Sequence, residues 1–139
     1  MEKLDLKIES RAQEVMEKDA LNAFPNECCG FFFGIENGVR NITQAIPVQN
    51  SKKGDKRRRF FIDPTDYMWA ERYAAENGAQ LLGIYHSHPK HPADPSEHDR
   101  SQAMPWFSYI ILSVNNDEIQ AVKSFQLNEE RQFEEENIL

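Results

Sequence analysis

The chain has 139 residues, of which 40% are hydrophobic and nine are Phe, enough to form the interior of one compact domain. Its net charge of −7 argues against general nucleic-acid binding, because neutralising phosphates needs a basic surface. No run approaches the roughly 18 to 20 apolar residues that cross a bilayer, and residues 1–10 lack the apolar stretch of a secretory signal. We therefore expect one domain over residues 1–139 that is soluble and cytoplasmic. We expect neither a membrane nor a nucleic acid as its partner.

The first third of the chain is predicted to form a helix followed by two strands. Residues 8–23 carry apolar side chains at the spacing of one helix face, namely Ile8, Ala12, Val15, Met16 and Ala20. Pro25 and Asn26 end this helix, and the apolar run 28–35 then indicates a buried strand. Residues 36–38, Glu-Asn-Gly, are a hairpin signal, so residues 39–48 are predicted to return as the next strand.

The middle of the chain is predicted to form a loop, a short strand and a helix. Residues 49–56 are polar and contain Gly54, which indicates a loop, and residues 59–62 then favour a short strand. Asp63 suits the N-cap of a helix and Pro64 is tolerated at its first position. This helix is expected to run to Asn77, where Gly78 supplies the stop.

The remaining segments complete an α/β pattern. Residues 81–86 are almost continuously apolar, which predicts a central strand, and a proline-rich loop follows. A short helix is predicted to begin near Ser96 and to finish before Pro105. Residues 107–114 and 118–127 are predicted to form a strand hairpin, and the acidic tail from about residue 128 is expected to be frayed or helical. Strands interleaved with helices indicate an α/β domain around a mixed sheet.

The two cysteines and the charge clusters have ordinary interpretations beside functional ones. Cys28 and Cys29 are adjacent, so they are poorly placed for a disulfide and are interpreted as buried small residues, with a catalytic thiol as the alternative. The charges gather in a basic run and an acidic tail, each of which is commonly a solvated segment. The basic run holds Lys52, Lys53, Lys56, Arg57, Arg58 and Arg59, and the tail holds Glu129, Glu130, Glu134, Glu135 and Glu136.

The most informative segment begins at the end of the predicted central strand. His86 and His88 are two apart, so on a strand both imidazoles project from the same face and can point at one metal ion. Pro89 stops the strand there, and strand ends are where open α/β sheets tend to place ligand sites.

A third ligand is predicted from the short helix that follows. Ser96 and Asp99 are three apart and share a helix face, and the proline-rich loop is long enough to fold that face over the histidines. Two imidazoles and one carboxylate form a common hydrolytic zinc set, in which an open fourth position marks a catalytic site. Ser-x-x-Asp alone is more often a helix cap, and spacing does not exclude His91, His98 or Asp94 as rival ligands.

These residues resemble the metal signature of the JAMM (MPN+) metallopeptidase family. The pattern is His-Ser-His-Pro at residues 86–89, six further residues, and then Ser96-x-x-Asp99. The family also carries a Glu beside a Cys-Gly run, which Asn26-Glu27-Cys28-Cys29-Gly30 matches. The resemblance spans residues 8 to 127 and implies a three-layer α/β/α sandwich similar to that of cytidine deaminases.

The resemblance also implies a role for each site residue. His86, His88 and Asp99 would hold one Zn²⁺ per chain, with water in the fourth place. Glu27 would be the general base and later the general acid, a role that the residues alone do not assign. Ser96 would hydrogen-bond the developing oxyanion or the water, while Ser87 is expected to lie on the opposite face of the strand.

The implied substrate follows from the short length of the chain. It is similar to small prokaryotic members of the family, which are associated with cleavage after the C-terminal Gly-Gly of ubiquitin-like sulfur-carrier proteins. The basic residues Lys56, Arg57 and Arg58 would attract such acidic carriers.

Three other functions are alternatives to this interpretation. A noncatalytic MPN-like scaffold is disfavoured by the complete ligand set. A zinc deaminase is disfavoured because the Pro-Cys-x-x-Cys signature is absent. A cysteine hydrolase using Cys28 or Cys29 would survive chelators but not thiol alkylation.

Overall fold

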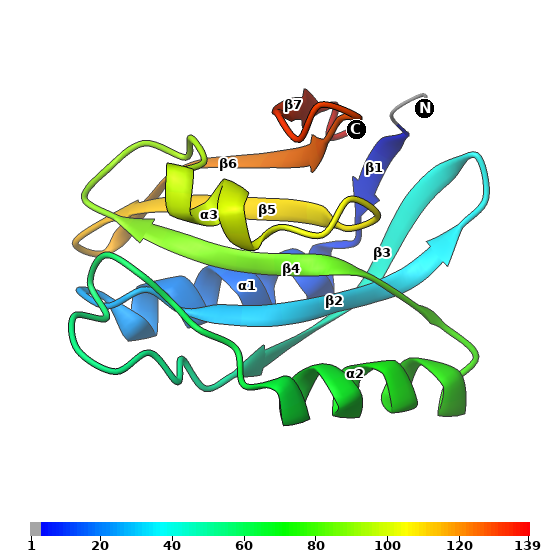
Figure 1. Cartoon of the computed structure of the whole chain (residues 1–139), viewed down its shortest axis with the longest axis horizontal. Coiled ribbons are helices and arrows are strands. Elements are labelled where there is room, and N and C mark those ends of the chain that lie inside the picture. Colours follow the sequence, from blue (N-terminus) through cyan, green and yellow to red (C-terminus); the bar gives the residue numbers. More distant parts are fainter. Residues whose placement is uncertain (1–3) are drawn as a thin grey trace.

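A seven-stranded mixed sheet in the order β1-β3-β2-β4-β5-β6-β7 forms the centre of the computed structural model, which describes residues 4–139 (Figure 1). In chain order the elements are β1 (Asp5–Ile8), α1 (Ser10–Ala23), β2 (Cys29–Glu36), β3 (Val39–Val48), α2 (Pro64–Glu76), β4 (Gln80–Pro89), α3 (Glu97–Gln102), β5 (Ser108–Asn115), β6 (Glu118–Leu127) and β7 (Phe133–Glu136). This architecture confirms the expected α/β domain around a mixed sheet.

The helices cover both faces of the sheet and create two apolar layers. Ala12, Met16 and Ala20 of α1 pack in one cluster that includes Phe32 and Tyr85. Ala70 and Ala74 of α2 pack in a second cluster on the opposite face, whose members include Phe31, Phe33 and Ile84. The division follows from the strand pleat, because alternate side chains of β2 and β4 point to opposite faces.

Strand β4 occupies the middle of the sheet and later carries the site. It pairs antiparallel with β2 and parallel with β5, and its residues from Leu82 to Pro89 are buried. Its apolar composition matches this burial on both faces. Gly83 is required by the close approach of β5, because an added Cβ would lie 1.9 Å from the carbonyl oxygen of Ser108.

The N-terminal prediction was wrong in one respect, because residues 5–8 form a strand and the helix begins at Ser10. Leu6 is fully buried and Asp5 and Lys7 are exposed, so this segment alternates with the period of a strand. Ile8 therefore belongs to β1, which pairs parallel with β3, rather than to the buried face of α1.

The strand predicted for residues 59–62 is also wrong, because this segment is irregular. The side chain of Asn50 takes the place of a partner strand. Its Oδ1 accepts from the backbone nitrogens of Lys52 and Phe61, and its Nδ2 donates to the backbone oxygens of Glu27 and Arg59. One side chain thus fixes the basic loop against the start of β2.

The acidic tail is a strand and not a frayed or helical segment. Residues 133–136 form β7, which pairs antiparallel with β6. Glu136 is 3% exposed and accepts hydrogen bonds from the hydroxyls of Ser108 and Ser124. Beyond β7, Leu6 of β1 donates to the carbonyl of Asn137 and accepts from the nitrogen of Leu139. Within residues 4–139 no helix has the length and apolar character needed to cross a membrane.

Candidate metal centre

The two histidines of the predicted site project from β4 toward the face covered by α2 and α3. His86 and His88 are each 1% exposed and share their side of the strand with Ile84. Ser87 points to the other face, as expected, where its hydroxyl accepts a hydrogen bond of 2.8 Å from the nitrogen of Cys28. The alternation of the strand therefore brings the imidazoles together.

Asp99 reaches the histidines from the first turn of α3, and a capping box aims its carboxylate. The Ser96 hydroxyl accepts from the nitrogen of Asp99 at 3.0 Å, and Oδ2 of Asp99 accepts from the nitrogen of Ser96 at 2.9 Å. This reciprocal pair satisfies two backbone donors at the helix start. The same Oδ2 atom is the one that faces the imidazoles.

The three donor atoms form a nearly equilateral triangle. Nε2 of His86 lies 3.2 Å from Nε2 of His88, and Oδ2 of Asp99 lies 3.3 Å and 3.1 Å from those two nitrogens. Tetrahedral zinc with bonds of about 2.0 to 2.2 Å separates neighbouring ligand atoms by about 3.3 to 3.6 Å. The donor set and its spacing therefore fit a zinc ion.

The electrostatics of the triangle favour a cation as well. The backbone oxygen of Pro92 only accepts, so Nδ1 of His88, 2.8 Å away, carries the proton, and a neutral His88 presents a lone pair at Nε2. Burial lowers the pKa of His86, although Asp99 opposes this effect. Burial also acts to raise the pKa of Asp99, but the two imidazoles hold it well below its ordinary range. Asp99 therefore stays ionised, and an ionised carboxylate beside two imidazole nitrogens is a donor set that binds a divalent cation.

Two contacts that orient the imidazoles were not found from the sequence. The Pro92 carbonyl fixes the ring of His88, and the ring of Phe60 stacks on His86 with 4.5 Å between centroids. Nδ1 of His86 is buried with no hydrogen-bond partner in the described part of the chain. Packing against Phe60 therefore takes the orienting role that a hydrogen bond usually has around a metal-bound histidine. Phe60 carries no sequence signal beyond its hydrophobicity.

Glu27 lies beside this triangle because of the register between β2 and β4. Cys29 pairs with His86, so the residues just before β2 lie next to the end of β4. Glu27 is 3% exposed, and its Oε1 atom has no hydrogen-bond partner among residues 4–139. Burial, with a smaller contribution from the charge of Asp99, raises the pKa of Glu27 to about 9. A buried carboxyl that can gain and lose a proton thus lies next to the donor triangle.

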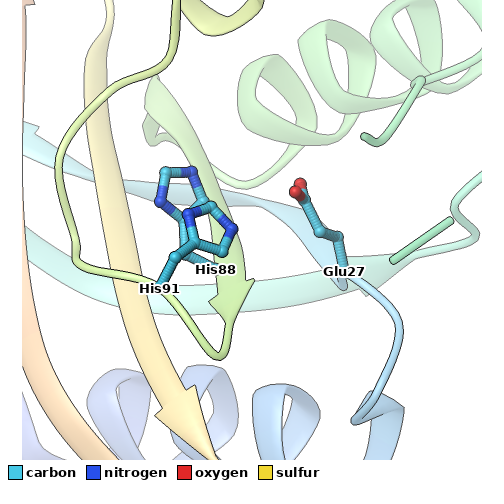
Figure 2. Close-up of side chains that lie close together, drawn as sticks. All are labelled: Glu27, His88 and His91. Carbon is cyan, nitrogen blue, oxygen red and sulfur yellow. The ribbon is translucent and has the colours of Figure 1, made fainter. Parts of the chain in front are cut away.

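The rival ligands lie in three different places. The ring of His91 stacks on His88 with 4.1 Å between centroids, and Glu27, His88 and His91 form a second group whose ligand atoms lie within 4.8 Å of one another (Figure 2). His98 lines the apolar pocket described below, and Asp94 pairs with Lys123 at the surface. Neither belongs to a group of metal-binding geometry in the described residues.

The cysteine thiols are poorly suited to nucleophilic chemistry. Both are buried, and burial raises the pKa of Cys29 to about 12 and that of Cys28 further still. Reactive cysteines need the opposite shift, because the thiolate is the nucleophile. The predicted role of both residues as buried small side chains agrees with this environment.

Two hollows near the site differ in character, one lined by two residues of the triangle and the other by His91. An apolar pocket of about 200 Å³ lies on the side of His86 and Asp99, and its walls include Phe60, Ile62, Tyr67 and Met104. A wider hollow of about 720 Å³ is lined by Arg57, Arg58, Lys90 and His91 together with two prolines. Part of the predicted basic run therefore forms a wall near His91.

Comparison with known proteins places these features in a family. Residues 9–128 match the family described as prokaryotic homologs of the JAB domain. A desampylase of Haloferax volcanii is 33% identical over 64% of this chain and 63% of its own length. A probable TtuB-protein conjugate cleaving protease of Thermus thermophilus is 32% identical over 69% of this chain and 61% of its own. The chain thus spans slightly less than two thirds of these two relatives.

Solved structures agree on the fold. A protein of Desulfitobacterium hafniense solved in solution has a TM-score of 0.84 and 31% identity, over 96% of this chain and 91% of that one. A JAB1/MPN domain protein of Archaeoglobus fulgidus, known from a crystal structure, has a TM-score of 0.56 and 19% identity over 98% and 99% of the two chains. The latter comparison concerns the fold alone.

Proposed function

This chain belongs to the family of prokaryotic JAB-domain homologs, and on that premise we propose that it is a zinc-dependent isopeptidase. Its substrate is the amide bond that follows the C-terminal Gly-Gly of a ubiquitin-like or sulfur-carrier protein. The observation that carries the proposal is the triangle of His86, His88 and Asp99 with the unpartnered carboxyl of Glu27 beside it. The names of the relatives, desampylase and TtuB-conjugate protease, support the substrate class.

The residues of the chain divide the chemistry between them. His86, His88 and Asp99 hold the zinc ion, which when bound lowers the pKa of water to about 7 and polarises a carbonyl group. Glu27 accepts the proton of the attacking water and later donates it to the leaving amine. Burial raises the pKa of Glu27 in the metal-free chain, and a nearby cation would lower it again toward the working pH, where a group can both accept and donate a proton. Ser96 is proposed to donate its hydroxyl hydrogen to the oxyanion, since its oxygen already accepts from Asp99.

The proposal is tested with purified protein and a carrier joined through Gly-Gly to a short peptide. We expect about one zinc ion per chain, release of the peptide, loss of release on chelation and recovery on adding zinc. Asp99→Asn should lose the ion and the activity. Asp94→Asn, the same change in the neighbouring loop at a surface ion pair, is the matched control and should keep both.

Two outcomes would contradict the assignment. If zinc is bound but no carrier conjugate is hydrolysed, the domain is a noncatalytic metal-binding scaffold. If the activity survives chelation and is removed by iodoacetamide, a cysteine supplies the nucleophile instead.

We further propose that Lys56, Arg57 and Arg58 attract the acidic carrier. Arg57 and Arg58 line the hollow beside His91, and Lys56 and Arg57 line a neighbouring open hollow of about 890 Å³. The double charge reversal R57E/R58E should raise KM about tenfold at low salt and leave kcat within about twofold, because rim charges steer association more than they affect chemistry. Unchanged kcat/KM on the carrier substrate would remove this segment from the binding surface.

A further inference from the structure

A second metal-binding group lies next to the triangle and shares one residue with it. It consists of Glu27, His88 and His91, whose ligand atoms lie within 4.8 Å of one another. Figure 2 shows the Glu27 side chain directed toward the paired rings of His88 and His91. These residues come from three segments: the residues just before β2, the end of β4, and the loop that follows β4.

His88 cannot serve both groups at once. Its Nε2 atom faces His86 and Asp99, and its Nδ1 atom is held by the carbonyl of Pro92. An imidazole nitrogen has one lone pair and binds one metal ion. When the triangle holds its ion, the ligands left in the second group are Glu27 and His91.

The free atoms of these two residues are suited to a cation. Oε1 of Glu27 is buried without a hydrogen-bond partner among residues 4–139. Neither ring nitrogen of His91 is in a hydrogen bond within the same range, whereas its backbone oxygen is fixed by the hydroxyl of Ser113 at 2.6 Å. The ring is held in place by stacking at 18° on His88, yet the residue is exposed, so an ion can enter from solvent.

We propose that Glu27 and His91 form a second, weaker zinc site that inhibits the enzyme when zinc is in excess. One carboxylate and one imidazole are ordinary zinc ligands, and solvent completes the coordination. Two protein ligands bind less tightly than three, so this site fills only after the triangle. Two-metal sites in other enzymes place their ions about 3.5 to 4 Å apart, so two neighbouring ligand groups can each hold an ion.

Inhibition follows from the identity of the shared carboxylate. A cation on Glu27 occupies the lone pairs that accept the proton of the attacking water, so the general base is lost. The inhibitory consequence rests on the proposed function of Glu27, whereas the number of bound ions does not. Activity should therefore be highest near one zinc ion per chain and fall as more zinc is added.

The experiment is a zinc titration of the metal-free protein by calorimetry. The unaltered chain should bind two ions, the second at least about tenfold more weakly than the first. His91→Phe retains a ring that can stack on His88 but has no ring nitrogen, and should bind one ion. Glu27→Gln, which replaces the second ligand, should also bind one ion. His98→Phe is the matched control and should bind two.

The peptide-release assay supplies a second measurement. The rate with excess zinc is divided by the rate of the same variant at one equivalent, so differences in basal rate cancel. His91→Phe should raise the zinc concentration for half-inhibition by about tenfold or more. A single ion on the unaltered chain, or two on both His91→Phe and Glu27→Gln, would overturn the second site. If no variant releases peptide but the ion counts hold, the proposed function fails and the site stands.

Discussion

At the scale of single residues, the cost of keeping Glu27 buried is the main electrostatic feature of the site. Its pKa of about 9, against an ordinary value of 4.5, means that the folded metal-free chain keeps a proton that the unfolded chain releases. The contribution of Glu27 to the free energy of unfolding is therefore fully present below its pKa in the unfolded chain. It falls as the pH rises toward its pKa in the folded chain. The contribution of Glu27 to the stability of the metal-free protein should be lost between about pH 5 and pH 9.

Glu27→Gln should remove most of this pH dependence. At pH 8 the metal-free variant should be more stable than the unaltered chain by about 2 kcal/mol or more, as measured by urea unfolding. The informative quantity is the slope of the free energy of unfolding against pH. The absolute free energy is less informative, because the buried Gln amide also requires hydrogen-bond partners. Parallel stability curves for the two chains would contradict the raised pKa.

The same substitution should separate binding from catalysis. Glu27 is not part of the triangle, so Glu27→Gln should retain the first zinc ion while its turnover falls by about 10²- to 10⁴-fold. Metal analysis and peptide release measured on one preparation check both expectations. A fully active variant would show that Glu27 is not the general base.

At the scale of elements, α3 is a short helix whose N-terminal cap positions a metal ligand. Ser96→Ala removes the oxygen that accepts from the nitrogen of Asp99 and should weaken the cap by about 1 kcal/mol. The backbone nitrogen of residue 96 still donates to the Asp99 carboxylate, but the helix turn that carries it is looser, so zinc affinity should fall by up to about tenfold. Ser96→Gly has no side-chain donor, yet Gly is tolerated at an N-cap at a cost of only a few tenths of a kcal/mol. If Ser96 only caps, the Gly variant should keep both zinc affinity and turnover close to those of the unaltered chain.

A role for Ser96 in stabilising the oxyanion gives a different result. The Gly variant would then bind zinc normally but turn over about 10²- to 10³-fold more slowly, the usual cost of losing one oxyanion donor. Calorimetry for zinc and kcat for the peptide-release assay distinguish the two roles.

The elements that could be predicted from the sequence are those with local signals. The buried strands carry apolar runs, and α2 and α3 carry Asp63-Pro64 and Ser96-x-x-Asp99 at their starts. The pairing of His86 with His88 on one face follows from strand alternation alone. These parts of the fold and of the candidate site depend on residues close together in the chain.

The parts that the sequence did not predict depend on contacts distant in the chain. Ile8 was assigned to the helix because it continues the apolar spacing, and residues 5–7 were given no element, although Leu6 is buried by pairing with β3. Residues 59–62 have strand composition, yet the side chain of Asn50 satisfies their backbone. Glu27 was singled out only by the family resemblance, because its place beside His88 results from the register of β2 on β4.

At the scale of the whole molecule, a buried hydrogen-bond network that includes Glu136 links four strands. The guanidinium of Arg40 donates to the Ser108 hydroxyl at 2.6 Å, and the hydroxyls of Ser108 and Ser124 donate to the Glu136 carboxylate. Arg40 is 8% and Glu136 is 3% exposed. Removing one charged member of such a network leaves its buried partners without hydrogen bonds.

Glu136→Ala should therefore lower the free energy of unfolding by about 3 kcal/mol. Glu130→Ala, at an exposed position of the same acidic tail, is the control and should change it by less than about 0.5 kcal/mol. Urea unfolding followed by circular dichroism measures both. Equal effects of the two substitutions would show that the tail contributes only general charge.

The contact of residues 137–139 with β1 has a consequence for how the molecule behaves in a crowded solution. An edge strand with unpaired backbone N–H and C=O groups is a template on which a second chain can pair, and such pairing leads to aggregation. Here the amide and the carbonyl of Leu6 are already engaged by Asn137 and Leu139. A partly folded neighbouring molecule therefore cannot pair with the backbone of Leu6 at this edge of the sheet. This protection should reduce aggregation at high protein concentration.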